Sequence, residues 1–84
     1  MYSIIFDEEA IEFLEKLEKN VARRIYNKII ETEEIPHRFF ERLAGRMDYK
    51  LRIGDYRAIA EIDNEKKIIQ ITLIGHRKNV YKKK

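Results

Sequence analysis

Residues 49–57 read Tyr-Lys-Leu-Arg-Ile-Gly-Asp-Tyr-Arg, and this stretch decides the fold of the second half of the chain. Apolar and cationic residues alternate up to Ile53, which is the period of a β-strand with one buried face. Gly54-Asp55 then has the composition of a two-residue hairpin loop. A loop of that length sets Arg52 directly across from Arg57. The stretch therefore predicts a β-hairpin with one core face and one cationic face.

A second hairpin is expected at Asn64-Glu65, again with a two-residue loop, which pairs Ala60 with Ile69 and Arg57 with Thr72. In this register the core face holds the apolar side chains of three strands: Met47, Tyr49, Leu51, Ile53, Tyr56, Ala58, Ala60, Ile62, Ile69, Ile71 and Leu73. The opposite face holds mainly polar and cationic side chains: Lys50, Arg52, Arg57, Gln70 and Thr72, with Ile59, Ile68 and Ile74 among them. A one-residue slip would bury two of these cations, so the pattern favours this register.

The first half of the chain has a helical period after a short strand at residues 2–6. Asp7 is a candidate N-cap for the first helix, and Asn20 is a candidate N-cap for the second. The second helix should end near Glu34, because Pro36 disfavours helical geometry at the residue before it. The predicted fold class is therefore α+β: an N-terminal strand and an antiparallel two-helix hairpin packed on a twisted antiparallel sheet, as a single domain over residues 1–84.

The composition excludes several classes of protein. The 84 residues include no cysteine and 2 histidines, so neither a disulfide framework nor a transition-metal centre is expected, and no cofactor is predicted. No apolar run is long enough to cross a bilayer, and the acidic N-terminal stretch does not read as a signal peptide. These features favour a cytoplasmic protein that does not bind membranes.

The charge is distributed unevenly along the chain. Residues 1–45 carry 7 Lys and Arg against 10 Asp and Glu, whereas residues 46–84 carry 11 against 5. The overall net charge is +3, but the second half alone reaches +6. Such an asymmetry indicates that the C-terminal half meets nucleic acid or another acidic partner.

The cationic face is the candidate site. Arg52 and Arg57 lie opposite each other in the predicted hairpin with Lys50 diagonal to them, and like charges so placed repel unless an anion joins them. A guanidinium fork binds phosphate oxygens bidentately. Arg77 follows the last strand and could reach the same face, with His76 and Tyr81 close by in sequence. Because these residues include no nucleophile with its base, the pattern favours a substrate that brings its own nucleophile, as RNA does with its 2′-hydroxyl.

Three segments carry a family resemblance: Leu43-Ala44-Gly45, the stretch 49–57, and Ile74-Gly75-His76-Arg77-Lys78-Asn79-Val80-Tyr81. Together they resemble the RelE/ParE toxin superfamily, and the match is closest to its archaeal and bacterial RelE branch. The resemblance implies the toxin of a type II toxin–antitoxin pair, a metal-independent mRNA endoribonuclease that acts on the ribosome and inhibits translation. It also implies neutralisation by a RelB-like antitoxin that wraps the toxin.

The resemblance further assigns roles by motif. Lys50 takes the position of the family's candidate proton-transfer lysine, and Arg52 and Arg57 match its phosphate and transition-state cations. Arg77 matches the arginine on the leaving-group side, and Tyr81 matches the tyrosine that stacks on or orients the substrate. His76 is a second candidate for proton transfer, so the general acid and base stay open.

Other interpretations remain for the same residues. The strand cations could be an ordinary solvated face, and Tyr49 and Tyr56 fall on the core face as packing residues. His37, after Pro36, is expected in a loop. At the level of function, a ParE-like toxin that inhibits DNA gyrase without RNase activity is one alternative. A catalytically inert RNA-binding module is another.

Overall fold

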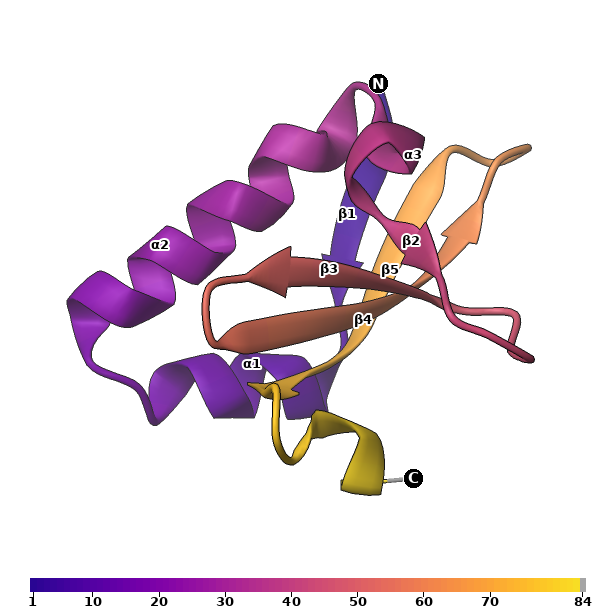
Figure 1. Cartoon of the computed structure of the whole chain (residues 1–84). Coiled ribbons are helices and arrows are strands. Elements are labelled where there is room, and N and C mark those ends of the chain that lie inside the picture. Colours follow the sequence, from indigo (N-terminus) through magenta and orange to yellow (C-terminus); the bar gives the residue numbers. More distant parts are fainter. Residues whose placement is uncertain (84) are drawn as a thin grey trace.

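In the computed structural model, which describes residues 1–83, one five-stranded sheet carries the helices on one of its faces (Figure 1). The elements follow in this order: β1 (Ser3–Phe6), α1 (Glu8–Glu15), α2 (Lys19–Ile30), the 3-10 turn η1 (Glu31–Glu33), α3 (Pro36–Phe39), β2 (Glu41–Arg42), β3 (Tyr49–Ile53), β4 (Tyr56–Asp63), β5 (Ile68–His76) and the 3-10 turn η2 (Val80–Lys83). The strand order across the sheet is β1-β5-β4-β3-β2. The α+β class predicted from the sequence is confirmed.

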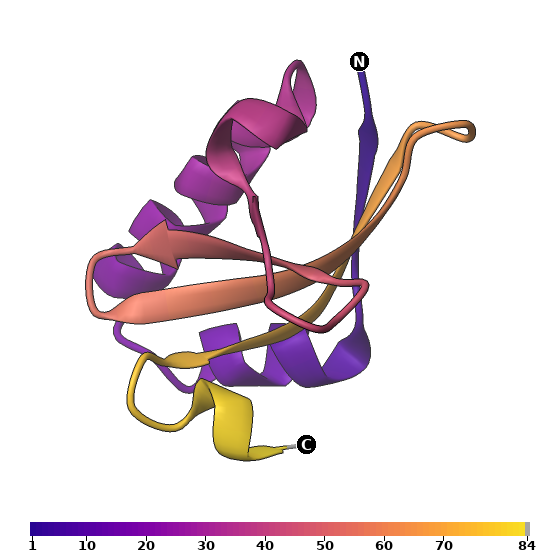
Figure 2. The ribbon, with the colours of Figure 1, turned by 45° about the vertical axis from the view of Figure 1, so that its right-hand side comes forward.

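The N-terminal strand differs from the others in direction. β3, β4 and β5 form an antiparallel set, as predicted, and β2 adds an antiparallel strand that was not predicted. β1 instead joins the edge of the sheet parallel to β5, with Ile4 paired to Ile69 and Phe6 to Ile71. The chain between β1 and β5 is long enough to return in the same direction, which a parallel pair requires. Both views place the N-terminus and the C-terminal turn at opposite ends of the molecule (Figure 2).

The two main helices form where the sequence pattern placed them, with different ends. Asp7 is the N-cap residue of α1, but its carboxylate accepts a 2.8 Å hydrogen bond from the Gln70 amide rather than capping the helix with its side chain. The prediction of Asn20 as the second N-cap is wrong, because α2 already begins at Lys19 after Glu18. The α-helical part of α2 ends at Ile30, earlier than the predicted Glu34, and the chain continues as a 3-10 turn.

Two short elements that the sequence did not predict follow η1. Pro36 occupies the first turn of α3, where its missing N–H costs nothing, and His37 is therefore helical rather than a loop residue. The two-residue strand β2 then pairs Glu41 with Lys50 and Arg42 with Tyr49. This pairing makes β3 an inner strand of the sheet, with neighbours on both sides.

The first hairpin has the predicted register. Ile53 pairs with Tyr56, Arg52 with Arg57, and Lys50 with Ile59, around a two-residue turn at Gly54-Asp55. Gly54 has φ +60°, a left-handed conformation that glycine adopts without a Cβ penalty. The placement of the two arginines across from each other is therefore a property of the turn.

The predicted register of the second hairpin is wrong. Its loop has four residues, from Asn64 to Lys67, so Asp63 pairs with Ile68 and Ala60 with Ile71. A bulge at Thr72 then shifts the ladder again, and Ile59 pairs with Leu73. The Thr72 hydroxyl donates a 3.3 Å hydrogen bond to the Ile59 carbonyl, which supports the bulge.

The bulge reverses the side-chain alternation beyond it. Ile74, predicted on the face opposite the core, packs in the main core, whereas Leu73, predicted in that core, packs on the other face with Ile59 and Val80. Met47 was also predicted on the core face, but it precedes β3 and is 80% exposed. The face of the sheet away from the helices is called the outer face below.

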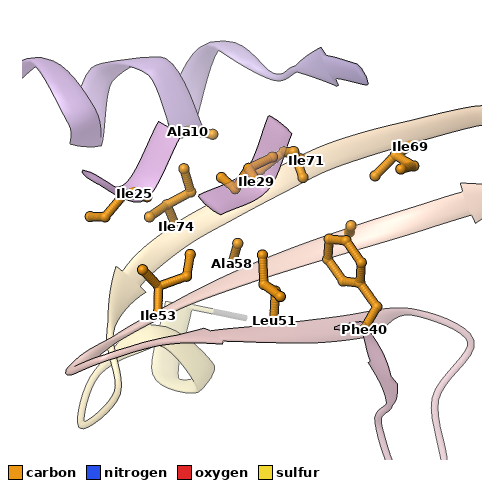
Figure 3. Close-up of a cluster of buried hydrophobic side chains, with 11 residues drawn as sticks. Ala10, Ile25, Ile29, Phe40, Leu51, Ile53, Ala58, Ile69, Ile71 and Ile74 are labelled. Carbon is orange, nitrogen blue, oxygen red and sulfur yellow. The ribbon is translucent and has the colours of Figure 1, made fainter. Parts of the chain in front are cut away.

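The main core lies between the helices and the inner face of the sheet. Ala10, Ile25 and Ile29 from α1 and α2 meet Phe40, which lies between α3 and β2, and apolar side chains from the strands, as Figure 3 shows: Leu51, Ile53, Ala58, Ile69, Ile71 and Ile74. Each fully buried isoleucine contributes roughly 1.5–3 kcal/mol through its removal from water. This packing makes the sheet a rigid platform for the side chains on its outer face. No helix among residues 1–83 is both long and apolar enough to cross a membrane.

The loop of the second hairpin contains a backbone conformation that the sequence does not favour. Lys67 has φ 59°, a left-handed value that costs a side-chain-bearing residue about 1 kcal/mol. Its ammonium lies 5.2 Å from the centre of the Tyr2 ring, a contact worth about 0.5 kcal/mol at an exposed site. We therefore expect Lys67→Gly to raise the free energy of unfolding by about 0.5 kcal/mol in urea titrations. Lys66→Gly, one residue earlier at negative φ, should instead lower it.

Candidate active site on the outer face of the sheet

The site is built around the turn between β3 and β4. Arg52 and Arg57 are cross-strand partners next to this turn, and their side chains point to the outer face, away from Leu51 and Ala58 in the core. Lys50 lies two residues before Arg52 on the same face. Because the turn and the core packing fix both strands, the three cations have defined relative positions before any ligand arrives.

Arg57 is held by the backbone of its own turn. Its Nη1 donates hydrogen bonds to the carbonyl oxygens of Gly54 (2.8 Å) and Tyr56 (2.7 Å). These two bonds use both hydrogens of Nη1 and leave the Nε and Nη2 hydrogens as a fork. Such a fork matches two oxygens of one phosphate group. Arg57 is thus oriented by the protein and retains the edge that binds an oxyanion.

Lys50 and Arg77 have carboxylate neighbours, whereas Arg52 and Arg57 have none among the side chains of residues 1–81. Glu41 Oε1 lies 3.9 Å from Lys50 Nζ, and Asp55 Oδ1 lies 3.8 Å from Arg77 Nε. Among the side chains of residues 1–81, no carboxylate forms an ion pair with Arg52 or Arg57. Two like charges face each other without a counter-ion, so an anion bound between them would relieve their repulsion.

The β3–β4 turn also positions Arg77. The backbone N–H of Arg77 donates a 2.8 Å hydrogen bond to the Asp55 carbonyl oxygen, which ties the segment after β5 to the β3–β4 turn. The backbone of Arg77 is therefore held at the turn that also orients Arg57. Neither Asp55 nor Glu41 was singled out from the sequence. Asp55 belongs to the predicted turn, which was a usable signal, whereas the two-residue strand β2 has no pattern that could have placed Glu41.

Tyr81 is positioned by a close approach between η2 and the sheet. Val80 is fully buried against Ile59 and Leu73 on the outer face. A Cβ at Gly75 would lie 3.2 Å from Val80 Cβ, so the glycine makes room for this packing. Tyr81, the next residue, is 40% exposed and lies at the end of the outer face that carries Arg57, which pairs with Gly75. Tyr81 therefore offers an accessible ring near this end of the outer face.

His76 is not brought to the outer face. It pairs with Tyr56, and the two rings meet edge to face with their centroids 5.8 Å apart. Tyr56 packs against the main core, so His76 lies on the helix side of the sheet. Its Nδ1 accepts a 3.2 Å hydrogen bond from the backbone N–H of Lys78. The bulge in β5 causes this placement, because it reverses the alternation before residue 76.

The packing roles predicted for two tyrosines agree with the structure, since Tyr49 and Tyr56 are half-buried against the main core. Lys84 lies outside the described residues. Among residues 1–83, no three His, Cys, Asp or Glu side chains lie close enough together to hold a metal ion.

Comparison with known proteins places this chain in a family. Residues 4–81 match the family model described as the ParE toxin of the type II toxin–antitoxin system parDE. The chain is also 30% identical over 79 residues to the mRNA interferase toxin RelE of Escherichia coli, a match that covers 90% of this chain and 83% of the relative. The chain belongs to the RelE/ParE toxin superfamily. It is a RelE-type toxin of a toxin–antitoxin system.

Solved structures of RelE-type toxins have the same fold. The chain is similar to an archaeal RelE in the RelE–RelB complex from Pyrococcus horikoshii, with a TM-score of 0.70 and 29% identity, covering 90% of this chain and 94% of that one. It is also similar in fold to a chain of the RelBE2 toxin–antitoxin complex from Mycobacterium tuberculosis, with a TM-score of 0.80 and 24% identity, covering 90% and 98%. In this RelE-type chain the superfamily fold carries the arginine pair on its outer face.

Proposed function

We propose that the chain is an endoribonuclease that cleaves mRNA on translating ribosomes by attack of a 2′-hydroxyl on the adjacent phosphate. The observation that carries this proposal is the pair Arg52 and Arg57, fixed across from each other without a carboxylate partner among residues 1–81. A preorganised pair of guanidinium groups suits the extra negative charge of a pentacoordinate phosphorus. The similarity to an mRNA interferase toxin supports RNA as the substrate.

The proposed step needs no nucleophile from the protein. The 2′-oxygen forms a bond to phosphorus and loses its proton, while the bond from phosphorus to the 5′-oxygen breaks and that oxygen gains a proton. The products are a 2′,3′-cyclic phosphate and a 5′-hydroxyl. No electron donor or acceptor enters the step, and we propose that it proceeds without a metal ion.

The site residues divide these tasks. Arg57 and Arg52 bind the scissile phosphate and stabilise its transition state, and Arg77 lies on the leaving-group side. Tyr81 offers an exposed ring on which an unstacked base can lie. Lys50 is the candidate proton carrier on the outer face. His76 is the weaker candidate, because it lies on the helix side of the sheet.

The proposed partners are the ribosome, mRNA and a RelB-like antitoxin, and the proposed place of action is the cytoplasm. The Pyrococcus relative forms a complex with RelB, which supports an antitoxin for this chain. The chain also offers edge strands with unpaired backbone groups and a C-terminal half with net charge +6, which would attract an acidic partner.

A ParE-like activity, inhibition of DNA gyrase by binding alone, is the second candidate, since the matching family model is that of the ParE toxins. Two assays on the purified chain separate the two functions. We expect it to cleave mRNA on programmed ribosomes and to leave gyrase supercoiling unaffected. Gyrase inhibition without RNA cleavage would instead establish the ParE-like function. Binding of RNA without either effect would leave the inert RNA-binding module.

A further inference from the structure

The two main helices carry opposite charges, although they are neighbours. α1 contains four glutamates and no cation, whereas α2 contains four cations and no carboxylate. The α2 cations are Lys19, Arg23, Arg24 and Lys28. Among the side chains of residues 1–81, the only ion pair of an α2 cation is that of Lys28 Nζ with Glu31 Oε1, at 3.6 Å. The other three cations of α2 are exposed and form no ion pair with any carboxylate side chain within residues 1–81.

A shallow hollow of about 330 Å³ lies along this helix, and five of its six lining residues carry hydrogen-bond donors; the sixth, Glu31 at the start of η1, is a carboxylate that pairs with Lys28. The lining residues are Asn20, Arg23, Arg24, Asn27, Lys28 and Glu31, which we call the α2 face. They recur at helical spacing along one side of α2, and the helix rises about 12 Å from the first to Lys28. That length corresponds to about three or four nucleotides of a strand at 3.4 Å each. Guanidinium, ammonium and amide groups are the side chains that bind phosphate oxygens.

The α2 face continues toward the candidate active site through the β3–β4 turn. Arg24 Nη2 lies 3.8 Å from the position that a Cβ would take on Gly54, whose carbonyl oxygen binds Arg57. Figures 1 and 2 both show this turn beside the first half of α2. One turn thus separates the α2 face on the helix side from the arginine pair on the outer face. A polyanion larger than a single short strand could contact both.

We propose that the α2 face binds the phosphate backbone of RNA as a docking surface separate from the cleavage site. A sugar-phosphate backbone fits better than an acidic protein, because protein–protein interfaces have an apolar centre and the hollow has no apolar lining residue. The glutamates of α1 repel the same backbone, so RNA approaches from the side of α2 and the turn. The inference requires RNA binding but not RNA cleavage.

The test uses an RNA hairpin with 2′-O-methyl sugars, which lacks the 2′-hydroxyl and stays intact whether or not the chain is a nuclease. The double variant Arg23→Gln/Arg24→Gln removes the two charges of the α2 face that have no carboxylate partner among the side chains of residues 1–81. We expect its Kd for the hairpin to rise roughly 10- to 100-fold near 0.1 M salt. The plot of log affinity against log salt concentration should become shallower by about 1.8, because about 0.9 counterion is released per neutralised phosphate.

The matched control is Lys16→Gln/Lys66→Gln, which removes the same net charge from residues outside the hollow and should change both quantities far less. An unchanged salt slope in the α2 variant, or an equal loss in the control, would overturn the proposal. Loss of antitoxin affinity with unchanged RNA affinity would also overturn it, and would make the α2 face a protein interface. Failure of mRNA cleavage by the wild-type chain would count against the proposed function alone.

Discussion

Arg57→Ala should lower the single-turnover rate of mRNA cleavage on programmed ribosomes by about 100- to 1000-fold, the loss typical of removing one preorganised oxyanion donor. The guanidinium is oriented by two backbone carbonyls, so its free edge reaches the phosphate without reorganisation. Arg57→Lys keeps the charge but loses the fork, and we expect an intermediate rate. Because the site rests on a rigid sheet, we expect Arg57→Ala to slow the cleavage step itself and to leave the folded structure of the variant unchanged.

Arg38→Ala is the matched control for this prediction. Arg38 is an exposed residue of α3, outside the candidate site, and its removal takes away the same side chain and charge. We expect its cleavage rate to stay within about twofold of the wild type. Cleavage by Arg57→Ala at the wild-type rate would remove Arg57 from the mechanism. Thermal unfolding of both variants separates a chemical effect from a loss of folded protein.

The largest expected effect on stability comes from the main core. Ile71 is fully buried where β5 meets both β1 and β4, since it pairs with Phe6 and Ala60. Ile71→Ala should lower the free energy of unfolding by about 2–5 kcal/mol, because it leaves a cavity that the sheet and helices cannot close. The total free energy of unfolding of a small domain is only about 5–15 kcal/mol. Part of the Ile71→Ala protein should therefore be unfolded under working conditions.

Ile5→Ala makes the same chemical change on the neighbouring strand. Ile5 is 48% exposed and pairs with Gln70, the residue before Ile71. We expect it to cost less than about 1 kcal/mol in the same urea titrations. Equal losses of unfolding free energy for Ile71→Ala and Ile5→Ala would contradict the burial of Ile71 and the exposure of Ile5 described for β5 and β1.

The position of the arginine pair could be predicted because two independent features of the surrounding sequence give the same strand register. The alternation of residues 49–53 and the Gly54-Asp55 turn both point to the same register, and a slip would bury two cations. The N-terminal strand was likewise predictable from its run of apolar, aromatic and β-branched residues, and both helices from their period. Helix ends were less accurate, because polar residues such as Asn20 suit a first turn as well as a cap.

The second hairpin could not be read correctly, for a physical reason. Leu73 and Ile74 are both apolar, so either one satisfies the core, and the alternation does not reveal the bulge at Thr72. The four-residue loop also depends on Lys67 in a left-handed conformation, which its residue type does not favour. The missed bulge is the reason why His76 was predicted near the arginine pair, whereas the structure puts it on the helix side of the sheet. Lys50 becomes the stronger candidate for proton transfer.

The central claim is that the arginine pair promotes attack by a 2′-hydroxyl of ribosome-bound mRNA. The most direct test is single-turnover cleavage of mRNA on programmed ribosomes in the presence of a metal chelator that leaves the ribosomes assembled. We predict cleavage to a 2′,3′-cyclic phosphate, and no cleavage of the same mRNA with one 2′-deoxy nucleotide at the scissile position. Equal cleavage of the deoxy substrate, or an intact ribonucleotide substrate, would contradict the account.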